Sequence, residues 1–162
     1  MTYVEDLSSC EMFAHPDAPE QILAVGWLER GHAYQQGPVR EEVVDALITL
    51  FVNPWQQPIA VNETQECSFC RLSKGRDALA RIYQKGSMLP ISIGGPYLFV
   101  PSHRCVYVAP AMILHYIDAH EYEPPQPFCQ AFLACPPMRS VPYFRTLLST
   151  DGGRSLVKLS RL

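Results

Sequence analysis

The sequence is short of several features that would assign it to a class. Residues 1–13, MTYVEDLSSCEMF, carry no basic segment followed by an apolar core, so no secretory signal is visible. The longest apolar run, Val106–Leu114, is far shorter than the roughly 20 residues of a membrane span. A net charge of -3 argues against a general nucleic-acid or membrane-surface binder. We therefore expect a cytoplasmic protein without a membrane or nucleic-acid partner.

Motifs of the common nucleotide and metalloprotease sites are also missing. The sequence has no Walker loop, no G-x-G-x-x-G, no H-E-x-x-H and no basic stripe with interleaved aromatic residues. It has no internal repeat and no low-complexity tract. With 162 residues, the chain is long enough to bury about 68–70% of its unfolded surface. A metal would therefore fix local geometry rather than replace a missing core.

Proline placement and hydrophobic periodicity predict short elements. Fifteen prolines favour several short segments joined by stiff turns. Strand-like runs occur at Gln21–Leu28, whose length also allows a short helix, and at Ser87–Ile93, Tyr97–Val100 and Arg104–Val108. Apolar spacing and proline boundaries predict helices at Pro38–Asn53, Lys74–Gln84, Phe128–Cys135 and Val141–Leu148, and a central helix that Pro110 opens and Pro124-Pro125 closes. We expect a turn at Asp151–Arg154 and a surface segment or a last strand at the end.

These elements predict an α+β protein. We expect residues 1–19 to form an extended N-terminal arm that pairs with a sheet edge. Residues 20–162 would then form one zinc-stabilised domain. Its short antiparallel strands and several helices would surround a treble-clef-like zinc knuckle, because the order knuckle, strands, helix with ligands is typical of such modules.

Two close pairs of metal-binding residue types stand out. Cys67-Ser-Phe-Cys70 is a C-x2-C pair, and His115 and His120 form an H-x4-H pair further along the chain. Thiolate and imidazole are the usual ligands of tetrahedral zinc, and both spacings lie within the range of structural zinc sites. The sequence therefore predicts a Zn2+ site at Cys67, Cys70, His115 and His120.

The spacing of the two histidines restricts this site. Residues five apart on an ideal helix point in directions that differ by about 140°. His120 must therefore lie at a frayed or tightened helix end if it is to share an ion with His115. Asp118 or His103 in place of one histidine is the main alternative within the metal interpretation. If these residues bind no metal, the alternative is a pair of buried thiols and two histidines without a special function.

The remaining cysteines and the nearby aromatic residues have simpler interpretations. Cysteines in a chain without a secretory signal favour reduced thiols over disulfides. The four outside the pair are expected to be core or surface thiols: Cys10, Cys105, Cys129 and Cys135. His103-Arg104-Cys105 would place a base beside a nucleophile, but no third partner accompanies them. We expect four aromatic residues around the histidines to line the core: Tyr107, Tyr116, Tyr122 and Phe128.

The segments that contain these residues resemble a group of small bacterial proteins of uncharacterised function. Those proteins carry a G-W-L segment, a C-x-x-C pair and an H-Y-x-x-x-H-x-Y-x-P-P-x-x-F block. The corresponding stretches here are VGWLERGHAYQQGPV, ECSFC and HYIDAHEYEPPQPF, within roughly residues 22–138. The resemblance implies a metal at the same four residues and no established activity. The long segment Arg71–Lys85 departs from the pattern.

Two function hypotheses of different class follow. A closed set of four ligands favours structural zinc in a protein that binds another macromolecule, as an immunity or accessory factor, and a small acidic protein suits a basic partner. The alternative is a metal-dependent hydrolase or nuclease of treble-clef type, which would need an open coordination position and a base such as His103, Asp118 or Glu121. A redox role of the cysteine pair is the weakest hypothesis, because the βαβ unit that surrounds such pairs in thioredoxin-like proteins is absent from the predicted elements. These observations favour a binding protein over an enzyme.

Overall fold

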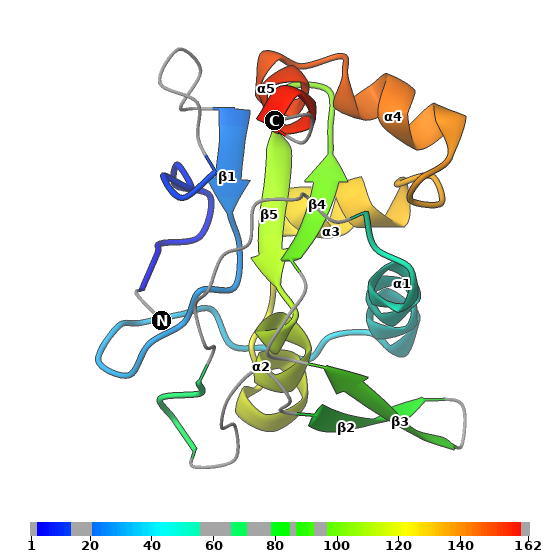
Figure 1. The fold of residues 1–162 in the computed structure, drawn as a ribbon. Helices are drawn as coiled ribbons and strands as arrows, with labels where there is room; N and C mark the ends of the chain where they lie inside the picture. Colours follow the sequence, from blue (N-terminus) through cyan, green and yellow to red (C-terminus); the bar gives the residue numbers. More distant parts are fainter. Residues whose placement is uncertain are drawn as a thin grey trace.

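The computed structural model describes residues 3–13, 21–55, 66–70, 79–84, 87–92 and 97–159. Within these ranges the chain forms a three-stranded sheet, a separate hairpin and five helices (Figure 1). The strands are β1 (Ile22–Ala24), β2 (Leu79–Gln84), β3 (Ser87–Ser92), β4 (Tyr97–Pro101) and β5 (Val106–Pro110). The helices are α1 (Glu41–Val52), α2 (Met112–His120), α3 (Gln126–Leu133), α4 (Val141–Leu147) and α5 (Asp151–Leu159). The α+β class is confirmed.

The sheet is mixed, with the strand order β1-β5-β4. β4 pairs with β5 in the antiparallel direction, as expected for neighbouring strands with a short connection. β1 pairs with β5 in the parallel direction, so the expectation of antiparallel strands alone was wrong. A parallel pair needs a long connection, and about half of the chain lies between these two strands. β4 and β5 are buried along their whole length.

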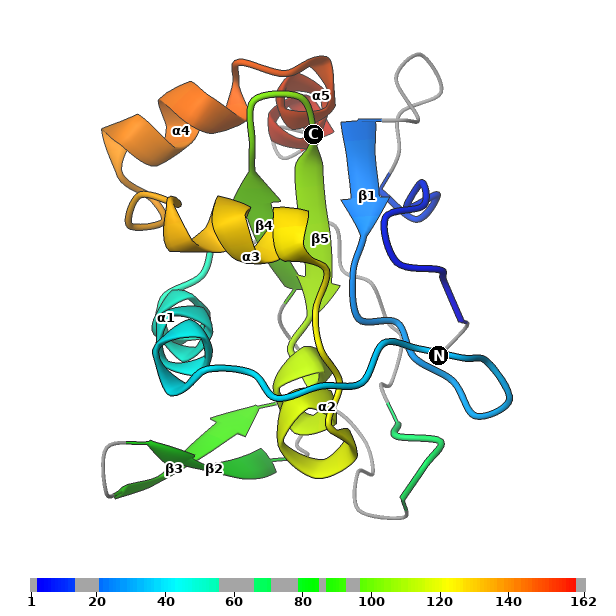
Figure 2. The ribbon, with the colours of Figure 1, turned by 180° about the vertical axis from the view of Figure 1, so that it is seen from behind.

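One helix lies across a face of this sheet, and others lie at its two ends. α3 lies across one face of β4 and β5 (Figure 2). α4 and α5 lie at the end where β4 finishes and β5 starts, whereas α2 follows β5 at the other end, beside the β2–β3 hairpin (Figures 1 and 2). β5 therefore connects two separate ends of the molecule.

The first described residues run beside β1. Ser9 forms a bridge with Leu23 and Val4 forms one with Trp27, both antiparallel. Two side chains of this segment, Cys10 and Phe13, enter the core. Residues 3–13 therefore cover the free edge of β1. The predicted boundary between residues 19 and 20 lies outside the described residues.

Most predicted elements are present. α1 begins at Glu41, after Pro38, and its apolar stripe is buried at Val43, Leu47, Ile48, Leu50 and Phe51. β3, β4, β5, α2, α3 and α4 all occur within or near their predicted ranges. A proline lies in the first turn of both α3 and α4, and Ser140 accepts a hydrogen bond from the backbone N–H of Tyr143 at 3.3 Å at the start of α4.

Two predicted elements were wrong. Residues 79–84 of the expected helix Lys74–Gln84 form β2, and residues 74–78 lie outside the described residues. Ile and Tyr favour strands, and the partner strand β3 begins only two residues later, so hairpin pairing overrides the helical spacing. The expected turn at Asp151–Arg154 is the first turn of α5. Thr150 Oγ1 accepts a hydrogen bond from Gly153 N at 3.0 Å and caps this helix.

Candidate metal centre

The four predicted ligands come together from two parts of the chain. Cys67 and Cys70 lie on the segment 66–70, and His115 and His120 lie on α2. Cys67 Sγ is 3.3 Å from His120 Nε2, Cys70 Sγ is 3.2 Å from His115 Nε2, and all four ligand atoms lie within 4.8 Å of one another. Sulfur and nitrogen ligands of tetrahedral zinc are about 3.5 Å apart. This group, the candidate metal centre, could hold a metal ion.

The end of α2 brings the two imidazoles to one side. Glu121 has a left-handed backbone with φ 54°, and its N–H donates to the carbonyl of Tyr116, five residues earlier. This wider hydrogen-bonded turn reduces the rotation per residue, so the end of α2 is widened rather than frayed or tightened. The ring centroids of His115 and His120 are 5.1 Å apart. Tyr34 donates its hydroxyl to the carbonyl of His120 at 3.2 Å and holds this end in place.

The loop between the two cysteines is held by its own middle residues. The ring of Phe69 lies 5.0 Å from that of His120, 6.0 Å from Tyr116 and 5.5 Å from Tyr34. Arg30 donates its backbone N–H to Ser68 Oγ at 2.7 Å and its guanidinium to the carbonyl of Phe69 at 3.1 Å. These contacts tie the loop to α2 and to the chain after β1, and they keep the thiols facing the histidines.

The protonation of the candidate metal centre favours neutral imidazoles. Burial lowers the pKa of both His115 and His120, so both rings are neutral near pH 7 and carry a lone pair for a metal. Burial raises the pKa of the Cys67 thiol, although backbone hydrogen bonds from Cys70 and Phe69 act in the opposite direction. A metal that binds here would displace thiol protons.

The alternative ligands lie outside this group. His103 is exposed in the turn between β4 and β5, at the opposite end of β5 from α2 (Figure 1). Asp118 is an exposed residue of α2 whose charge acts on His115, but it is not one of the clustered ligands. Among the described residues, the metal-binding cluster consists of the two cysteines and the two histidines alone.

The other predictions for cysteine and aromatic residues are confirmed. Cys10 and Cys105 are buried, Cys129 and Cys135 are half-buried, and none forms a disulfide. The four aromatic residues around the histidines are all buried, at 8% exposure or less: Tyr107, Tyr116, Tyr122 and Phe128.

A link between the N-terminal residues and α2 was not predicted. Asp6 accepts hydrogen bonds from Gly26 N at 2.8 Å and from the hydroxyl of Tyr122 at 2.7 Å. Gly26 has φ +81°, and a Cβ there would lie 3.0 Å from Ile113 of α2, so glycine allows this close approach. The carboxylate therefore joins the arm, the end of β1 and the segment after His120. No local signal in the sequence marks a pair 116 residues apart.

The order of elements departs from a simple knuckle, hairpin and helix. The cysteine loop precedes the β2–β3 hairpin, and α2 carries the histidines, but β4 and β5 lie between the hairpin and α2 in the chain.

The longest helix in the described ranges has 12 residues, and none there is both long and apolar enough to cross a membrane.

Comparison with known proteins gives a family but no activity. No curated protein and no solved structure shows a significant match to the chain. One family model matches residues 2–133, from the N-terminal residues to the last residue of α3, and so covers all four residues of the candidate metal centre. The chain therefore belongs to the family described as a domain of unknown function, DUF7919.

Proposed function

We propose that the candidate metal centre binds zinc as a structural ion. The convergence of two thiols and two imidazoles within 4.8 Å carries this proposal. Such a mixed sulfur and nitrogen set in tetrahedral geometry is typical of zinc, and two thiolates neutralise the charge of the ion. Zinc would join the cysteine loop to α2 in a variant of the treble-clef arrangement, with β4 and β5 inserted before the ligand helix.

Four protein ligands argue for structure rather than catalysis. They would complete a tetrahedral shell and leave no position for water or substrate, whereas catalytic zinc sites usually keep three protein ligands and an open position. The hydrolase alternative would also need a base close to the metal. His103 lies at the far end of β5, so this alternative would depend on Asp118 or Glu121.

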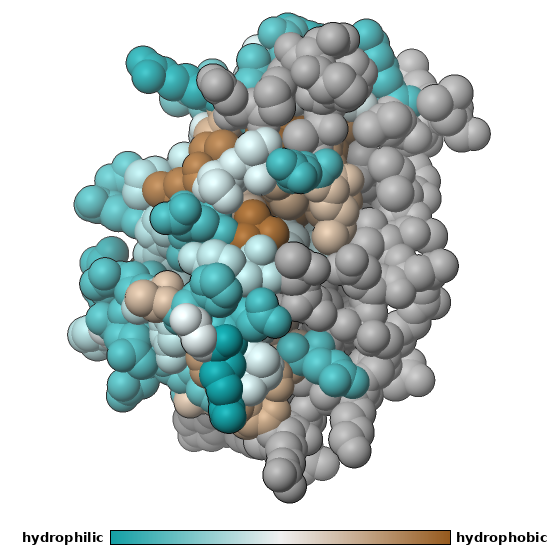
Figure 3. All heavy atoms as spheres, turned by 90° about the vertical axis from the view of Figure 1, so that its left-hand side faces the viewer, coloured by the Kyte–Doolittle hydropathy of each residue, from teal (hydrophilic) through white to brown (hydrophobic). Residues whose placement is uncertain are grey.

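We infer that the protein acts in the cytoplasm by binding another macromolecule, as an immunity or accessory factor. Its net charge of -3 would attract a basic partner. The face that carries β1 and the N-terminal residues supports a polar interface, because its described part is mainly hydrophilic with small separated apolar areas (Figure 3).

Metal analysis and cobalt substitution test the proposal together. Purified protein should contain about one zinc per chain, and replacement by Co2+ should give the absorption of four-coordinate cobalt with thiolate ligands. Hydrolysis of bis(p-nitrophenyl) phosphate should stay at the level of buffer. Protein prepared without chelator that lacks zinc would refute the metal site. A five-coordinate cobalt spectrum together with hydrolysis lost in Glu121→Gln or Asp118→Asn would instead support the hydrolase.

A further inference from the structure

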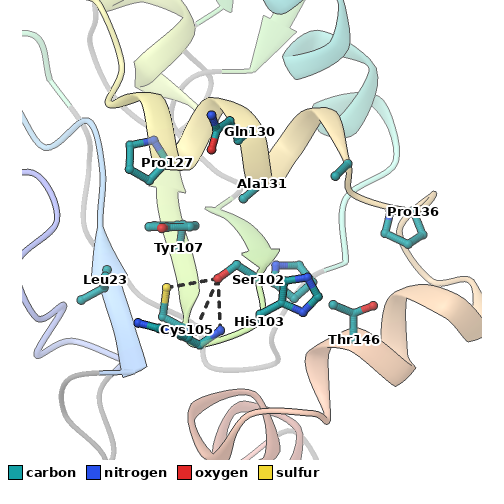
Figure 4. Close-up of a pocket in the computed structure, with 13 residues that line it drawn as sticks. Leu23, Ser102, His103, Cys105, Tyr107, Pro127, Gln130, Ala131, Pro136 and Thr146 are labelled. Carbon is teal, nitrogen blue, oxygen red and sulfur yellow. Dashed lines mark hydrogen bonds between the residues drawn. The ribbon is translucent and has the colours of Figure 1, made fainter.

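A cavity of about 680 Å³ opens at the end of β5 opposite the candidate metal centre (Figure 4). It lies between the β4–β5 turn, β5, α3, the residues that follow α3, and Thr146 of α4. We call it the turn pocket. Its volume falls within the range of small-molecule sites, roughly 300–1,000 Å³. The function proposed for the metal does not use it.

One part of the turn pocket is apolar. Tyr107 of β5 is buried and lies below Pro127 of α3, with Ala131 one turn further along that helix (Figure 4). Leu23 of β1 closes the side of the pocket. Burial and a hydrogen bond with Cys105 raise the pKa of Tyr107 to about 12, so its phenol stays neutral near pH 7. These side chains form a surface suited to a flat or aliphatic group.

The other part carries positive charge. The β4–β5 turn is closed by a hydrogen bond from Ser102 N to Cys105 O at 2.8 Å, and it presents Ser102, His103 and Arg104 to the pocket. His103 and Arg104 are exposed, and Arg104 forms no ion pair with any residue in the described part of the chain. Although the protein is acidic, none of the described residues that line the turn pocket is Asp or Glu.

We propose that the turn pocket binds a small organic carboxylate with an apolar body. The carboxylate would pair with the guanidinium of Arg104, which offers two parallel N–H donors, and with His103 and Ser102 beside it. The apolar body would lie against Tyr107 and Pro127. The ligand class follows from charge complementarity between an acid and this turn, and from the shape of the apolar wall.

Calorimetric titration of the full chain with naphthylacetate and with its neutral amide tests the ligand class. We expect saturable binding of naphthylacetate. The amide should bind with at least about tenfold lower affinity, because hydrogen bonds to charged groups are stronger than those between neutral groups. Arg104→Gln should weaken naphthylacetate to the level of the amide. Ala131→Trp should abolish binding by filling the pocket. Backbone amide NMR signals of residues 102–107 should shift on titration.

Arg145→Gln is the matched control, because Arg145 is an exposed arginine of α4 that does not line the turn pocket. Its affinity for naphthylacetate should stay within about twofold of the wild-type value. Arg104 is exposed, so its substitution should not prevent folding, and circular dichroism checks this. Equal affinity for acid and amide, an Arg104→Gln variant that binds as wild type, or no saturable binding of naphthylacetate would overturn the proposal.

Discussion

The polar side chains at the two ends of β5 are arranged in opposite ways. At the α2 end, two thiols and two imidazoles face one another within 4.8 Å, and the ring of Phe69 packs on that of His120. At the other end, Arg104 and His103 face a cavity of about 680 Å³ that the described side chains leave open. The four side chains at the α2 end could together bind one ion and complete a site. The side chains at the other end surround an open cavity and would need a ligand to fill it, so this end should contribute much less to the stability of the fold.

Substitution of a candidate ligand should have the largest effect. Cys67→Ser should lose zinc and lower the free energy of unfolding by at least about 3 kcal/mol, because loss of a bound metal belongs to the few large causes of destabilisation. Urea denaturation and elemental analysis measure both quantities. Cys129→Ser, a change of the same type at a half-buried thiol outside the centre, should keep its zinc.

Substitution at the turn pocket should affect stability much less than substitution of a candidate ligand. Arg104→Gln should change the free energy of unfolding by less than about 0.5 kcal/mol. In Cys67→Ser, hydrogen exchange should show that α1 stays protected while the cysteine loop opens, since the apolar stripe of α1 is held by burial in the hydrophobic core and supplies no ligand to the candidate metal centre. If α1 opened first, the division between the two ends would be wrong.

Removal of the ring that closes the metal-centre end should have an intermediate effect. Phe69→Ala should cost about 1–3 kcal/mol and also weaken zinc binding, because its ring fixes His120 and the loop between the cysteines. Phe144→Ala on α4 is the control, since this half-buried ring packs on Trp55 and Tyr143, away from the centre. It should lose stability but keep the zinc affinity, as competition with a chelating dye can measure.

Relief of backbone strain at the end of α2 should be a smaller, stabilising change. Glu121→Gly should raise the free energy of unfolding by up to about 1 kcal/mol, because glycine adopts the left-handed conformation at φ 54° without the steric cost of a Cβ. Thermal unfolding with bound zinc checks this. Glu121→Ala keeps the Cβ and should not stabilise the protein.

Asp6 should make stability depend on pH. Burial raises the pKa of this carboxyl, and hydrogen bonds from Gly26 and Tyr122 oppose the shift only in part. The folded protein therefore holds the proton more tightly than the unfolded chain, and this group lowers stability as the pH rises from about 4 through the raised value. The free energy of unfolding of the wild type minus that of Asp6→Asn should fall as the pH rises from about 4 through the raised pKa. A rise would show that the hydrogen bonds dominate.

Spacing along the chain was enough to name the four residues of the candidate metal centre, because C-x2-C and H-x4-H are local patterns. Their function as zinc ligands stays a prediction. The contacts that support them come from residues far apart, such as Arg30 with Phe69 and Asp6 with Tyr122, so no periodicity could indicate them. The widened turn that aligns His115 with His120 depends on one backbone conformation at Glu121.

The fold was predictable where one element carried its own signal. The apolar stripe of α1 and the prolines around α2 and α3 predicted these helices. β2 was missed because a hairpin is stabilised by its partner strand, and α5 because Asp151-Gly-Gly has the composition of a turn. Gly152 and Gly153 are required there by packing: a Cβ on Gly152 would lie 2.9 Å from Gln21, and one on Gly153 would overlap the carbonyl of Leu147. The turn pocket arises only when β5, α3 and the β4–β5 turn meet.

The separation of the two ligand pairs along the chain has a consequence for synthesis. Cys70 and His115 are 45 residues apart, and Cys67 and His120 are 53 residues apart. At about 5–20 residues per second, translation of the interval takes roughly 2 to 11 s. Throughout this time the growing chain carries two thiols without their imidazole partners. Their protection from oxidation then depends on the surroundings of the growing chain, until α2 has been made and its histidines can approach them.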